Sequence, residues 1–431
     1  MKKIISLLLC MALVFGLCAC GGLDKLSELP PLPTFTSAPA ATPQPAEASA
    51  APVPTEEPKV ETPQAGMIVE IRENEYRDYD PQNGENLILT FSYETPVVLI
   101  EDRPAVQKAI NEYIAILDET YYTGEDYGEG YGTGYMNMLT EAEDNYNYVV
   151  NEGIEGANLE FSCIRTAVVM RGDNNVLSVR YTDSSYTGGA HGMYDYTGYT
   201  FDTQTGKLIT LDTLTDDFAS LAAFLTGYMV NLANYDEDIS GRIDLVGTDL
   251  ESALGALVRE GSWYLADDGM HVYSSLYEIS SYAAGIIDFV IPYEELSTYI
   301  KPEYMPVSVS AKGGINAVPA EEAADAGKAI VGLVKTDEVG TQLYITVDGS
   351  VQNVKVSSVI YSGVSFYETA QLWYCSLMSD CALQIQTDIP DGMPKLMISF
   401  DTLDGQSRKL LTQSGDDGHL SLLDDDVMAV G

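Results

Sequence analysis

Few residues in this sequence are arranged for catalysis. The chain has 431 residues but three histidines, His191, His271 and His419, and no two of these are spaced to hold a metal ion together. The sequence also has no Gly-x-Ser-x-Gly elbow, no Ser-x-x-Lys pair and no phosphate-binding Walker loop. We therefore predict no catalytic residues, no metal and no cofactor. A hydrolase that uses two carboxylates is the catalytic alternative.

Tyrosine is the residue type that points most clearly to binding. A Tyr/Gly/acid segment between 121 and 135 interrupts both helical and strand periodicity, and tyrosines are large, rigid and amphipathic, which suits recognition. Its candidate ligand-binding residues are Tyr121, Tyr122, Tyr127, Tyr131 and Tyr135. Acids between them would complement a basic partner. The alternative is a mobile loop with no partner.

His191 is a further candidate ligand-binding residue because it lies in Gly188-Gly189-Ala190-His191-Gly192. Glycines allow positive φ and a close backbone approach, so the segment could be a ligand-facing loop. The simpler interpretation, which we favour, is a tight turn whose imidazole bonds to the backbone.

The segment 236–247 partly matches a calcium-binding loop. Acids and glycine occupy several of the expected positions, but Gly247 stands where a bidentate acid is needed. We therefore interpret this segment as a polar loop between helices.

The N-terminus predicts export and lipid attachment. Lys2 and Lys3 precede an apolar run over 4–16, which is too short to span a bilayer. Leu17-Cys18-Ala19-Cys20 follows and resembles the lipobox of bacterial lipoproteins. We predict a signal peptide over 1–19 and fatty-acylated Cys20, anchored in the cell membrane and facing outside the cytoplasm. The alternative is an ordinary secretory signal that is cut nearby.

The remaining cysteines do not form an extensive disulfide framework. Cys375 and Cys381 lie six residues apart and could be bridged in an oxidising compartment, or they could be two packed thiols. Cys163 is most simply a buried small hydrophobic residue.

The charge excludes one class of partner. The 65 acids and 22 bases give a formal net charge of -43, so nucleic acid is not an expected ligand. Such acidity could steer a basic partner, or it could serve solubility alone.

Composition and periodicity predict an α+β fold of two small sheet-plus-helix modules followed by a β-rich C-terminal domain. The predicted divisions are a disordered Pro/Ala/Thr-rich tether over 20–66, modules over 67–184 and 185–301, and the β-rich domain over 302–431. Helices are predicted from Pro104, over 136–150, 216–234 and 248–260, at 292–296, and near 320–334. Strands are predicted over 67–71, 87–93, 161–171, 176–182, 194–201 and 208–211, in a hairpin over 263–273, and over 286–291.

A resemblance to a known family covers roughly 67–300. Its most specific parts are the segment 188–192, Phe201-Asp202-Thr203-Gln204-Thr205-Gly206-Lys207-Leu208, the segment 264–269 and Ile291-Pro292-Tyr293. They resemble the paired ectodomain of the sigma-V-type anti-sigma factor, which binds lysozyme, and the modules that precede some peptidoglycan deacetylase domains. The resemblance implies an α+β ectodomain in Gram-positive cell-envelope biology. This chain lacks the family's cytoplasmic sigma-binding segment, and its C-terminal part lacks the histidines that a deacetylase needs for metal.

Together these features favour a non-catalytic surface lipoprotein that binds a protein, with a basic lysozyme as the most concrete candidate, or a cell-wall ligand. A module that binds glycan or peptidoglycan by stacking sugars on tyrosine is the second hypothesis, and the carboxylate hydrolase is the third.

Overall fold

The computed structural model describes residues 65–82, 84–124, 134–154, 156–157, 159–245, 247–306, 313–318, 327–336, 340–363, 365–387, 393–402, 407–414 and 420–424. The predicted signal peptide, Cys20, Tyr127, Tyr131, His419 and nearly all of the tether lie outside these residues. The chain divides into two compact units. The first contains Val69–Ser308 and Ala370–Leu372, and the second contains the described residues of Pro30–Ile68, Val309–Thr369 and Trp373–Gly431.

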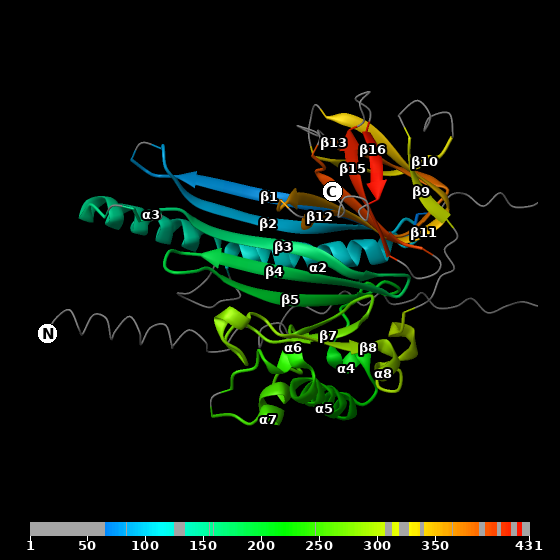
Figure 1. Ribbon diagram of the computed structural model, residues 1–431, viewed down its shortest axis with the longest axis horizontal. Coiled ribbons are helices and arrows are strands. Elements are labelled where there is room, and N and C mark those ends of the chain that lie inside the picture. Colours follow the sequence, from blue (N-terminus) through cyan, green and yellow to red (C-terminus); the bar gives the residue numbers. More distant parts are fainter. Residues whose placement is uncertain are drawn as a thin grey trace, which may run out of the picture. The chain divides into compact units, whose positions relative to one another are not determined.

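A sheet with the order β1-β2-β3-β4-β5 organises the first unit (Figure 1). Its strands are β1 (Ile68–Tyr79), β2 (Leu87–Leu99), β3 (Phe161–Gly172), β4 (Val176–Tyr186) and β5 (Met193–Asp202). β2 and β3 are parallel, whereas β3, β4 and β5 pair antiparallel through short turns. A parallel pair needs a long crossover, and two helices supply it here.

The crossover helices are α2 (Pro104–Thr123) and α3 (Tyr135–Glu152). α2 begins with proline in its first turn, as predicted, and ends at Gly124, whose φ of 75° is left-handed. Its apolar side chains at Ile110, Ile114 and Leu117 recur at helical spacing and are buried. Both helices therefore cover one face of the sheet.

A second layer of the first unit holds a three-stranded sheet in the order β6-β7-β8, with the strands β6 (Trp263–Leu265), β7 (Gly269–Tyr273) and β8 (Asp288–Pro292). Its helices are α4 (Leu211–Leu214), α5 (Phe218–Tyr235), α6 (Glu237–Ser240), α7 (Leu250–Gly255) and α8 (Tyr293–Leu296), with 3-10 turns at Tyr282–Ala284 and Pro302–Tyr304. The predicted hairpin is confirmed. Leu225, Met229 and Ile291 lie at the centre of the core between α5 and this sheet.

Two sequence predictions in the first unit need correction. The helix predicted over 248–260 is α7 alone, because the backbone leaves α-helical geometry in short turns after Gly255. The strand predicted over 208–211 is a single bridge between Phe201 and Leu208, since Thr210 caps α4. The predicted module boundary at 184/185 lies within β4, which pairs with β5 along ten residues, and it stays a prediction.

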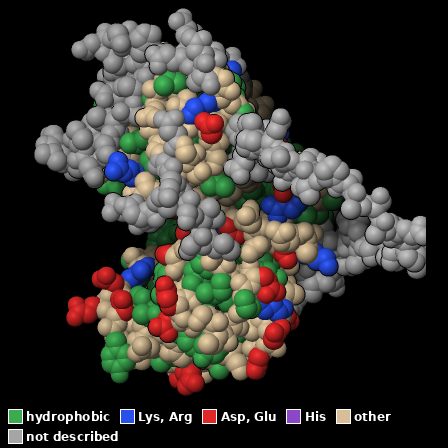
Figure 2. Space-filling model, turned by 90° about the vertical axis from the view of Figure 1, so that its right-hand side faces the viewer, with side chains coloured by type: hydrophobic (Ala, Val, Ile, Leu, Met, Phe, Trp, Pro, Cys, Tyr) green, Lys and Arg blue, Asp and Glu red, His purple; other side chains and the backbone are tan. Residues whose placement is uncertain are grey.

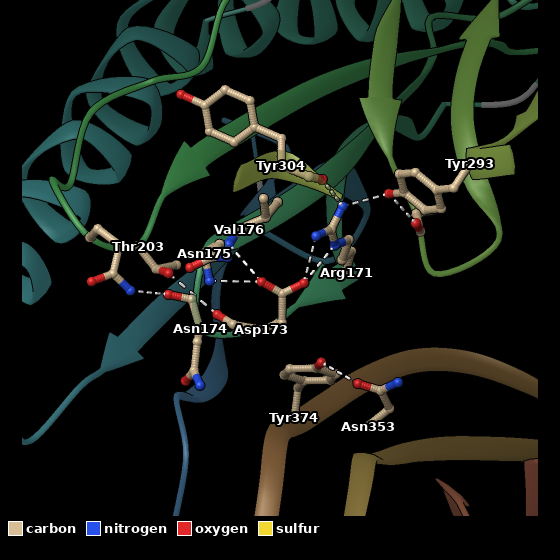
Figure 3. Close-up of polar contacts among 12 residues, drawn as sticks. Arg171, Asp173, Asn174, Asn175, Val176, Thr203, Tyr293, Tyr304, Asn353 and Tyr374 are labelled. Carbon is tan, nitrogen blue, oxygen red and sulfur yellow. Dashed lines mark hydrogen bonds and ion pairs between the residues drawn. The ribbon is translucent and has the colours of Figure 1, made fainter. Parts of the chain in front are cut away.

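Arg171 joins the two layers of the first unit (Figure 3). It is 2% exposed, and its guanidinium donates to the Tyr293 hydroxyl at 2.7 Å and to the Tyr304 carbonyl at 2.8 Å. Its Nε donates to Asp173 at 2.7 Å. Asp173 in turn accepts from Asn175 N in the β3–β4 turn, so the buried cation is paired and the turn is fixed.

The second unit is β-rich, as predicted. It contains β9 (Gly313–Val318), β10 (Ala329–Lys335), β11 (Thr341–Tyr361), β12 (Phe366–Ser379), β13 (Cys381–Thr387), β14 (Leu396–Asp401), β15 (Ser407–Ser414) and β16 (Leu420–Asp424). β11 pairs with β9 and β13 through its first part and with β14 through its second. At the register shift between Gln352 and Lys355, Asn353 has a φ of 50°, and its amide oxygen accepts from the Tyr374 hydroxyl at 2.9 Å (Figure 3).

The helix predicted near 320–334 is wrong for its described residues. Ala329–Lys335 is strand β10, which pairs parallel with β13. The apolar residues Ile330, Val331 and Val334 suit this pairing, and the β-branched type favours strands.

The α+β class and the β-rich C-terminal region are confirmed. Among the described residues, no helix is long and apolar enough to cross a membrane.

Candidate functional site

The tyrosines predicted to bind a ligand belong partly to the core. Tyr121 is 2% exposed, and its hydroxyl lies 3.2 Å from the buried Cys163 Sγ. Its ring packs with Phe91 at 5.2 Å between centroids, and the Arg165 guanidinium lies over it at 4.0 Å. A buried ring cannot be presented to a partner, so the prediction for Tyr121 is corrected.

Tyr122 and Tyr135 flank the same cluster and are half-buried. Their rings stack at 5.4 Å with an interplanar angle of 15°, and both pack on Tyr76. The Tyr135 hydroxyl donates to Asp78 at 3.0 Å. These contacts tie the end of α2 to the start of α3 and to β1. The tyrosine-rich segment that the sequence analysis selected therefore contributes to the packing of the fold.

His191 lies on an exposed aromatic surface. Its Nδ1 is 3.0 Å from the Gly192 carbonyl, which fits the predicted turn with an imidazole bonded to the backbone. The preceding Gly188 and Gly189 have φ values of 88° and 99°, which favour glycine. The imidazole also stacks on Tyr282 at 3.7 Å between centroids and 23° between planes. The turn therefore presents the ring rather than burying it.

Tyr277 and Tyr282 complete this surface, and the sequence reasoning did not select them. The Tyr282 hydroxyl donates to the Gly192 carbonyl at 2.8 Å, and the Tyr277 hydroxyl lies 3.5 Å from His191 Nε2. Tyr277 is 47% exposed although its φ is 64°, a left-handed conformation that is rare for a bulky residue. Nothing in the local sequence marks this conformation. We call His191, Tyr277 and Tyr282 the exposed aromatic cluster.

The exposed aromatic cluster adjoins the face of the five-stranded sheet that points away from α2. Tyr194 and Tyr196 lie on this face of β5, and both pack against Tyr264 and Tyr273 of the small sheet together with Tyr282. The Tyr196 ring meets Tyr273 edge-on at 5.8 Å. The first unit therefore carries a continuous run of tyrosines from the small sheet to the β4–β5 loop.

His271 lies beneath this run and is engaged on both sides. Its Nδ1 is 2.9 Å from Asp288, its Nε2 is 3.0 Å from Asp268, and its ring stacks on Tyr264, whose hydroxyl donates to Asp288 at 2.7 Å. Burial opposes the charge of His271, but hydrogen bonds to Asp268 and Asp288 outweigh it and raise its pKa to about 9. The imidazole is therefore a cation at neutral pH, and its arrangement suits structure better than proton transfer.

Two carboxyls with raised pKa values lie on β2 and α2. Burial raises the pKa of Glu94 to about 7, although this carboxyl accepts from Ala167 N at 2.6 Å. Burial likewise raises the pKa of Asp118 to about 6, although it accepts from the Thr95 hydroxyl at 2.6 Å. Each group is held by its own backbone or hydroxyl donor, and Asp118 is 8% exposed.

The segment that partly matched a calcium loop has a structural role. Asp236 caps α6, accepting from Asp238 N and Ile239 N at 3.0 Å each. The interpretation as a polar loop between helices fits this geometry. Within the described part of the chain, no group of three or more His, Cys, Asp or Glu side chains could hold a metal ion.

Cys375 and Cys381, for which the sequence left a disulfide and two packed thiols open, are free and buried. Cys375 Sγ donates to the Leu377 carbonyl at 3.2 Å, and Cys381 begins the next strand after a left-handed residue, Asp380. Burial raises the pKa of Cys375 to about 12 and that of Cys381 to about 11. The packed-thiol alternative therefore replaces the disulfide. Cys163 is buried, as predicted.

A strongly acidic surface covers the second layer of the first unit. Residues 204–306 contain 17 Asp and Glu against four Lys and Arg. Fourteen of those carboxylates are on exposed residues. Three of the four bases already have partners within the fold. Arg242 donates to the carbonyls of Ala284 and Ile286. Arg259 pairs with Glu278, and Lys301 donates to the Thr213 carbonyl. Figure 2 shows Asp and Glu side chains spread over the lower part of the view with few Lys or Arg among them.

Comparison with known families divides the first unit in two. Residues 82–194, from the β1–β2 turn to the start of β5, match the family model described as Deacetylase PdaC. Residues 233–294, from the end of α5 to the start of α8, match the model of a protein of unknown function, DUF3298. The chain contains a PdaC-like domain and a DUF3298 domain.

Two solved structures are similar to part of the chain. A DUF3298 family member from Bacteroides fragilis aligns with 56% of this chain and 96% of its own, at 18% identity and a TM-score of 0.41. A DUF3298 family protein from Pseudomonas aeruginosa aligns with 56% of this chain and 97% of its own, at 16% identity and a TM-score of 0.37. No curated protein matches the chain.

The DUF3298 domain supplies Tyr277, Tyr282 and His271, and the PdaC-like domain supplies His191 and Tyr194. The exposed aromatic cluster is thus assembled from both matched domains.

Proposed function

We propose that this protein is a non-catalytic binding protein of the cell envelope, anchored outside the cytoplasm by a lipid at Cys20, and that its first unit binds a basic protein. The observation that carries the proposal is the exposed carboxylate surplus over 204–306. Charges of one sign on one surface accelerate the association of a partner of opposite charge and select against partners of like charge.

The occupied bases strengthen this argument. Arg242 and Arg259 are half-buried and serve the fold, so they do not neutralise the carboxylates outside them. Lys207 is the exposed base among the four. A basic protein that approaches this surface therefore meets little repulsion.

The state of the histidines supports a non-catalytic role. His271 is committed to Asp268 and Asp288, and the His191 imidazole contacts a carbonyl and stacked rings. Neither imidazole is arranged with a nucleophile in the manner of a catalytic base. The name of the deacetylase family describes that family, and we do not extend its activity to this chain.

Binding to a basic lysozyme tests the proposal. We expect the full-length protein to retain lysozyme in a pull-down at low salt and to retain less at physiological salt, because salt screens exposed charges. A variant with Glu237→Gln, Asp238→Asn, Glu294→Gln and Glu295→Gln should bind more slowly, by roughly tenfold at low salt. A matched control neutralises four carboxylates of α3, Glu141→Gln, Glu143→Gln, Asp144→Asn and Glu152→Gln, and should bind like the wild type. Salt-independent binding, or equal loss in both variants, would contradict a partner steered by this surface.

The anchor is tested separately. We expect mass spectrometry of the membrane fraction to find a chain that begins at Cys20 and carries fatty acyl groups. A Cys20→Ser variant should appear in the medium or soluble fraction, because it lacks the thiol that carries the fatty acyl groups and these groups hold the protein on the bilayer. An unmodified and unprocessed chain inside the cell would overturn the proposed location.

A further inference from the structure

The turn between β11 and β12 carries large apolar and aromatic side chains at the surface of the second unit. It is closed by Ser362 N, which donates to the Ser365 carbonyl at 3.0 Å. Ile360 is 60% exposed and Tyr367 is 55% exposed. Exposed apolar side chains that gather at one place mark a contact surface for a protein or a membrane. Four side chains flank the turn, and we call them the apolar tip: Ile360, Tyr361, Phe366 and Tyr367.

The apolar tip has apolar side chains on both faces of the hairpin. The Ser358 and Thr369 hydroxyls lie 2.8 Å apart across the hairpin, so Ile360 and Tyr367 lie opposite each other on the same face, two residues nearer the turn. Tyr361 and the remaining ring of the tip lie on the other face, 5.0 Å apart between centroids. Tyr361 is 46% exposed. Because apolar groups line both faces up to the turn, the tip is a projection and not the floor of a groove.

The charged side chains next to the tip do not oppose its contact with an apolar medium. The Glu368 carboxylate follows the tip in β12 and is paired with Lys409 Nζ at 3.1 Å. Val359 N donates to the Lys395 carbonyl at 2.9 Å, so Lys395 lies on the neighbouring strand just behind the tip. Met393, which is 44% exposed, precedes it and extends the apolar surface. A lysine behind an apolar surface can extend its ammonium group to the polar side of that contact.

The predicted tether joins the second unit at a suitable distance from the tip. Gly66 N donates to the Leu377 carbonyl at 2.8 Å, and Leu377 lies near the end of β12 that is remote from the turn. The ten residues of strand between Tyr367 and Leu377 span about 33 Å. A flexible chain of about 45 residues, as between Cys20 and Gly66, has a root-mean-square length of roughly 35–40 Å. A chain held to a bilayer through Cys20 can therefore bring the tip to the same bilayer.

We propose that the apolar tip inserts into the interface of a lipid bilayer and gives the lipid-anchored chain a second contact with the membrane. Lipid surrounds an inserted projection, so both faces of the hairpin leave water together. A rigid protein partner would need a cleft that matches both faces. Tyrosine suits the level of the lipid head groups, because its ring is apolar and its hydroxyl still finds a hydrogen-bond partner there. A tip of four side chains binds weakly and reversibly, so it orients the second unit and does not replace the anchor.

This inference uses the proposed lipid anchor for its reach alone, and the test removes that anchor. The protein is the chain from residue 20 onward with Cys20→Ser, which keeps every described residue. The probe is a vesicle of phosphatidylcholine, with or without added phosphatidylglycerol. We expect the protein to float with the phosphatidylcholine vesicles. At low salt, added phosphatidylglycerol should weaken binding, because the chain as a whole is strongly acidic.

Paired substitutions locate the contact. Ile360→Ser with Tyr367→Ser should lower the partition coefficient by about tenfold, because two apolar side chains no longer leave water. Tyr148→Ser with Val150→Ser on α3 is the matched control, since these side chains are 61% and 43% exposed in the first unit. The control should bind like its parent. Far-ultraviolet circular dichroism and the melting temperature confirm that each variant is folded.

A fluorescent reporter measures insertion directly. Tyr367→Trp places an indole on the tip, and the natural Trp263 and Trp373 are only 4% and 1% exposed. With vesicles, the added emission should move to shorter wavelength and should be quenched by lipids that carry bromine on their acyl chains. Tyr235→Trp is the matched reporter, because Tyr235 is 83% exposed on α5, and it should show neither change.

Four results would overturn the proposal. The first is the lack of vesicle binding by the folded parent, and the second is binding that requires phosphatidylglycerol. The third is equal binding by the tip and control variants. The fourth is a dimer in analytical ultracentrifugation that only the tip variant dissociates, since a second copy would then cover the tip. Failure to find acylated Cys20 in cells would remove the anchor but would leave these vesicle measurements unchanged, so the two proposals can fail separately.

Discussion

The first unit contains two tyrosine clusters that differ in their exposure to solvent. The buried cluster lies between the helices and the sheet, where Tyr121 packs on Phe91 and Tyr122 stacks on Tyr135. The exposed aromatic cluster lies on the other face, where His191 stacks on Tyr282 beside Tyr277. Both clusters combine stacked rings with satisfied hydroxyls. The two clusters differ in whether other elements of the fold pack over the rings, and the local sequence does not determine this.

This comparison explains why a tyrosine-rich segment was a poor guide to a binding surface. α2 ends at Thr123 and α3 begins at Tyr135, so the tyrosines at these ends fall onto the core face of each helix. Tyr277 and Tyr282 of the exposed cluster lie more than 80 residues after His191 in the sequence, so they meet it only when the chain folds. Density along the chain and density in space are therefore separate properties.

Removing a ring from the buried cluster should have the largest effect. We expect Tyr121→Ala to lower the free energy of unfolding by about 3–5 kcal/mol, because it leaves a cavity against Phe91 and removes the stack with Arg165. Urea denaturation measures this loss. Tyr235→Ala is the control and should stay within about 0.5 kcal/mol of the wild type. A small loss at Tyr121 would contradict its assignment to the core.

The second-largest effect is expected from pH, which should change the free energy of unfolding through the buried carboxyl of Asp118. A carboxyl whose pKa is higher in the folded state holds its proton more tightly there, so stability falls as pH rises. For Asp118, the decline should run from about pH 4 to its folded pKa of about 6. We expect Asp118→Asn to flatten this part of the stability profile and to raise stability at pH 8 by about 1–3 kcal/mol relative to the wild type.

The same substitution offers a control on mechanism. Asparagine keeps an acceptor for the Thr95 hydroxyl, so at pH 4 the variant and the wild type should be nearly equally stable. A variant that is destabilised equally at both pH values would show that Asp118 acts through its hydrogen bond and not through the cost of its buried charge.

The smallest effect on stability is expected from Asp268, which pairs with His271 beneath the run of tyrosines. The raised pKa of His271, about 9, stabilises the fold fully below about pH 6.5, and this contribution is lost as pH rises through 9. Asp268 is 67% exposed, so Asp268→Asn should cost less than about 1 kcal/mol at pH 7 while lowering the pKa of His271. Nuclear magnetic resonance titration of the imidazole measures the shift. An unchanged pKa would leave Asp288 as the partner that sets the charge.

Much of the fold could be predicted from local patterns. Pro104 identified the start of α2, because proline suits the first turn of a helix. Alternating residues identified β3 and β4, and Asp267-Asp268-Gly269 identified the hairpin between β6 and β7. These features depend on neighbours within a few residues.

Predictions failed where partners distant in sequence decide the structure. Ala329–Lys335 is a strand because β13 pairs with it about fifty residues later. Arg171 is buried because Tyr293 and Tyr304 meet its guanidinium, a contact that spans more than 120 residues. Local propensity cannot anticipate such contacts, since tertiary pairing outweighs differences of less than about 1 kcal/mol per residue.

By itself, the sequence determined the α+β class and the acidity, because each follows from composition or from residues close together in the chain. Only the tertiary structure decided which tyrosines are core and which are exposed, that Cys375 and Cys381 are packed thiols, and that His271 is a cation. The physical reason is that burial and charge pairing depend on which surfaces meet, and this is fixed only when the sheets and helices pack together.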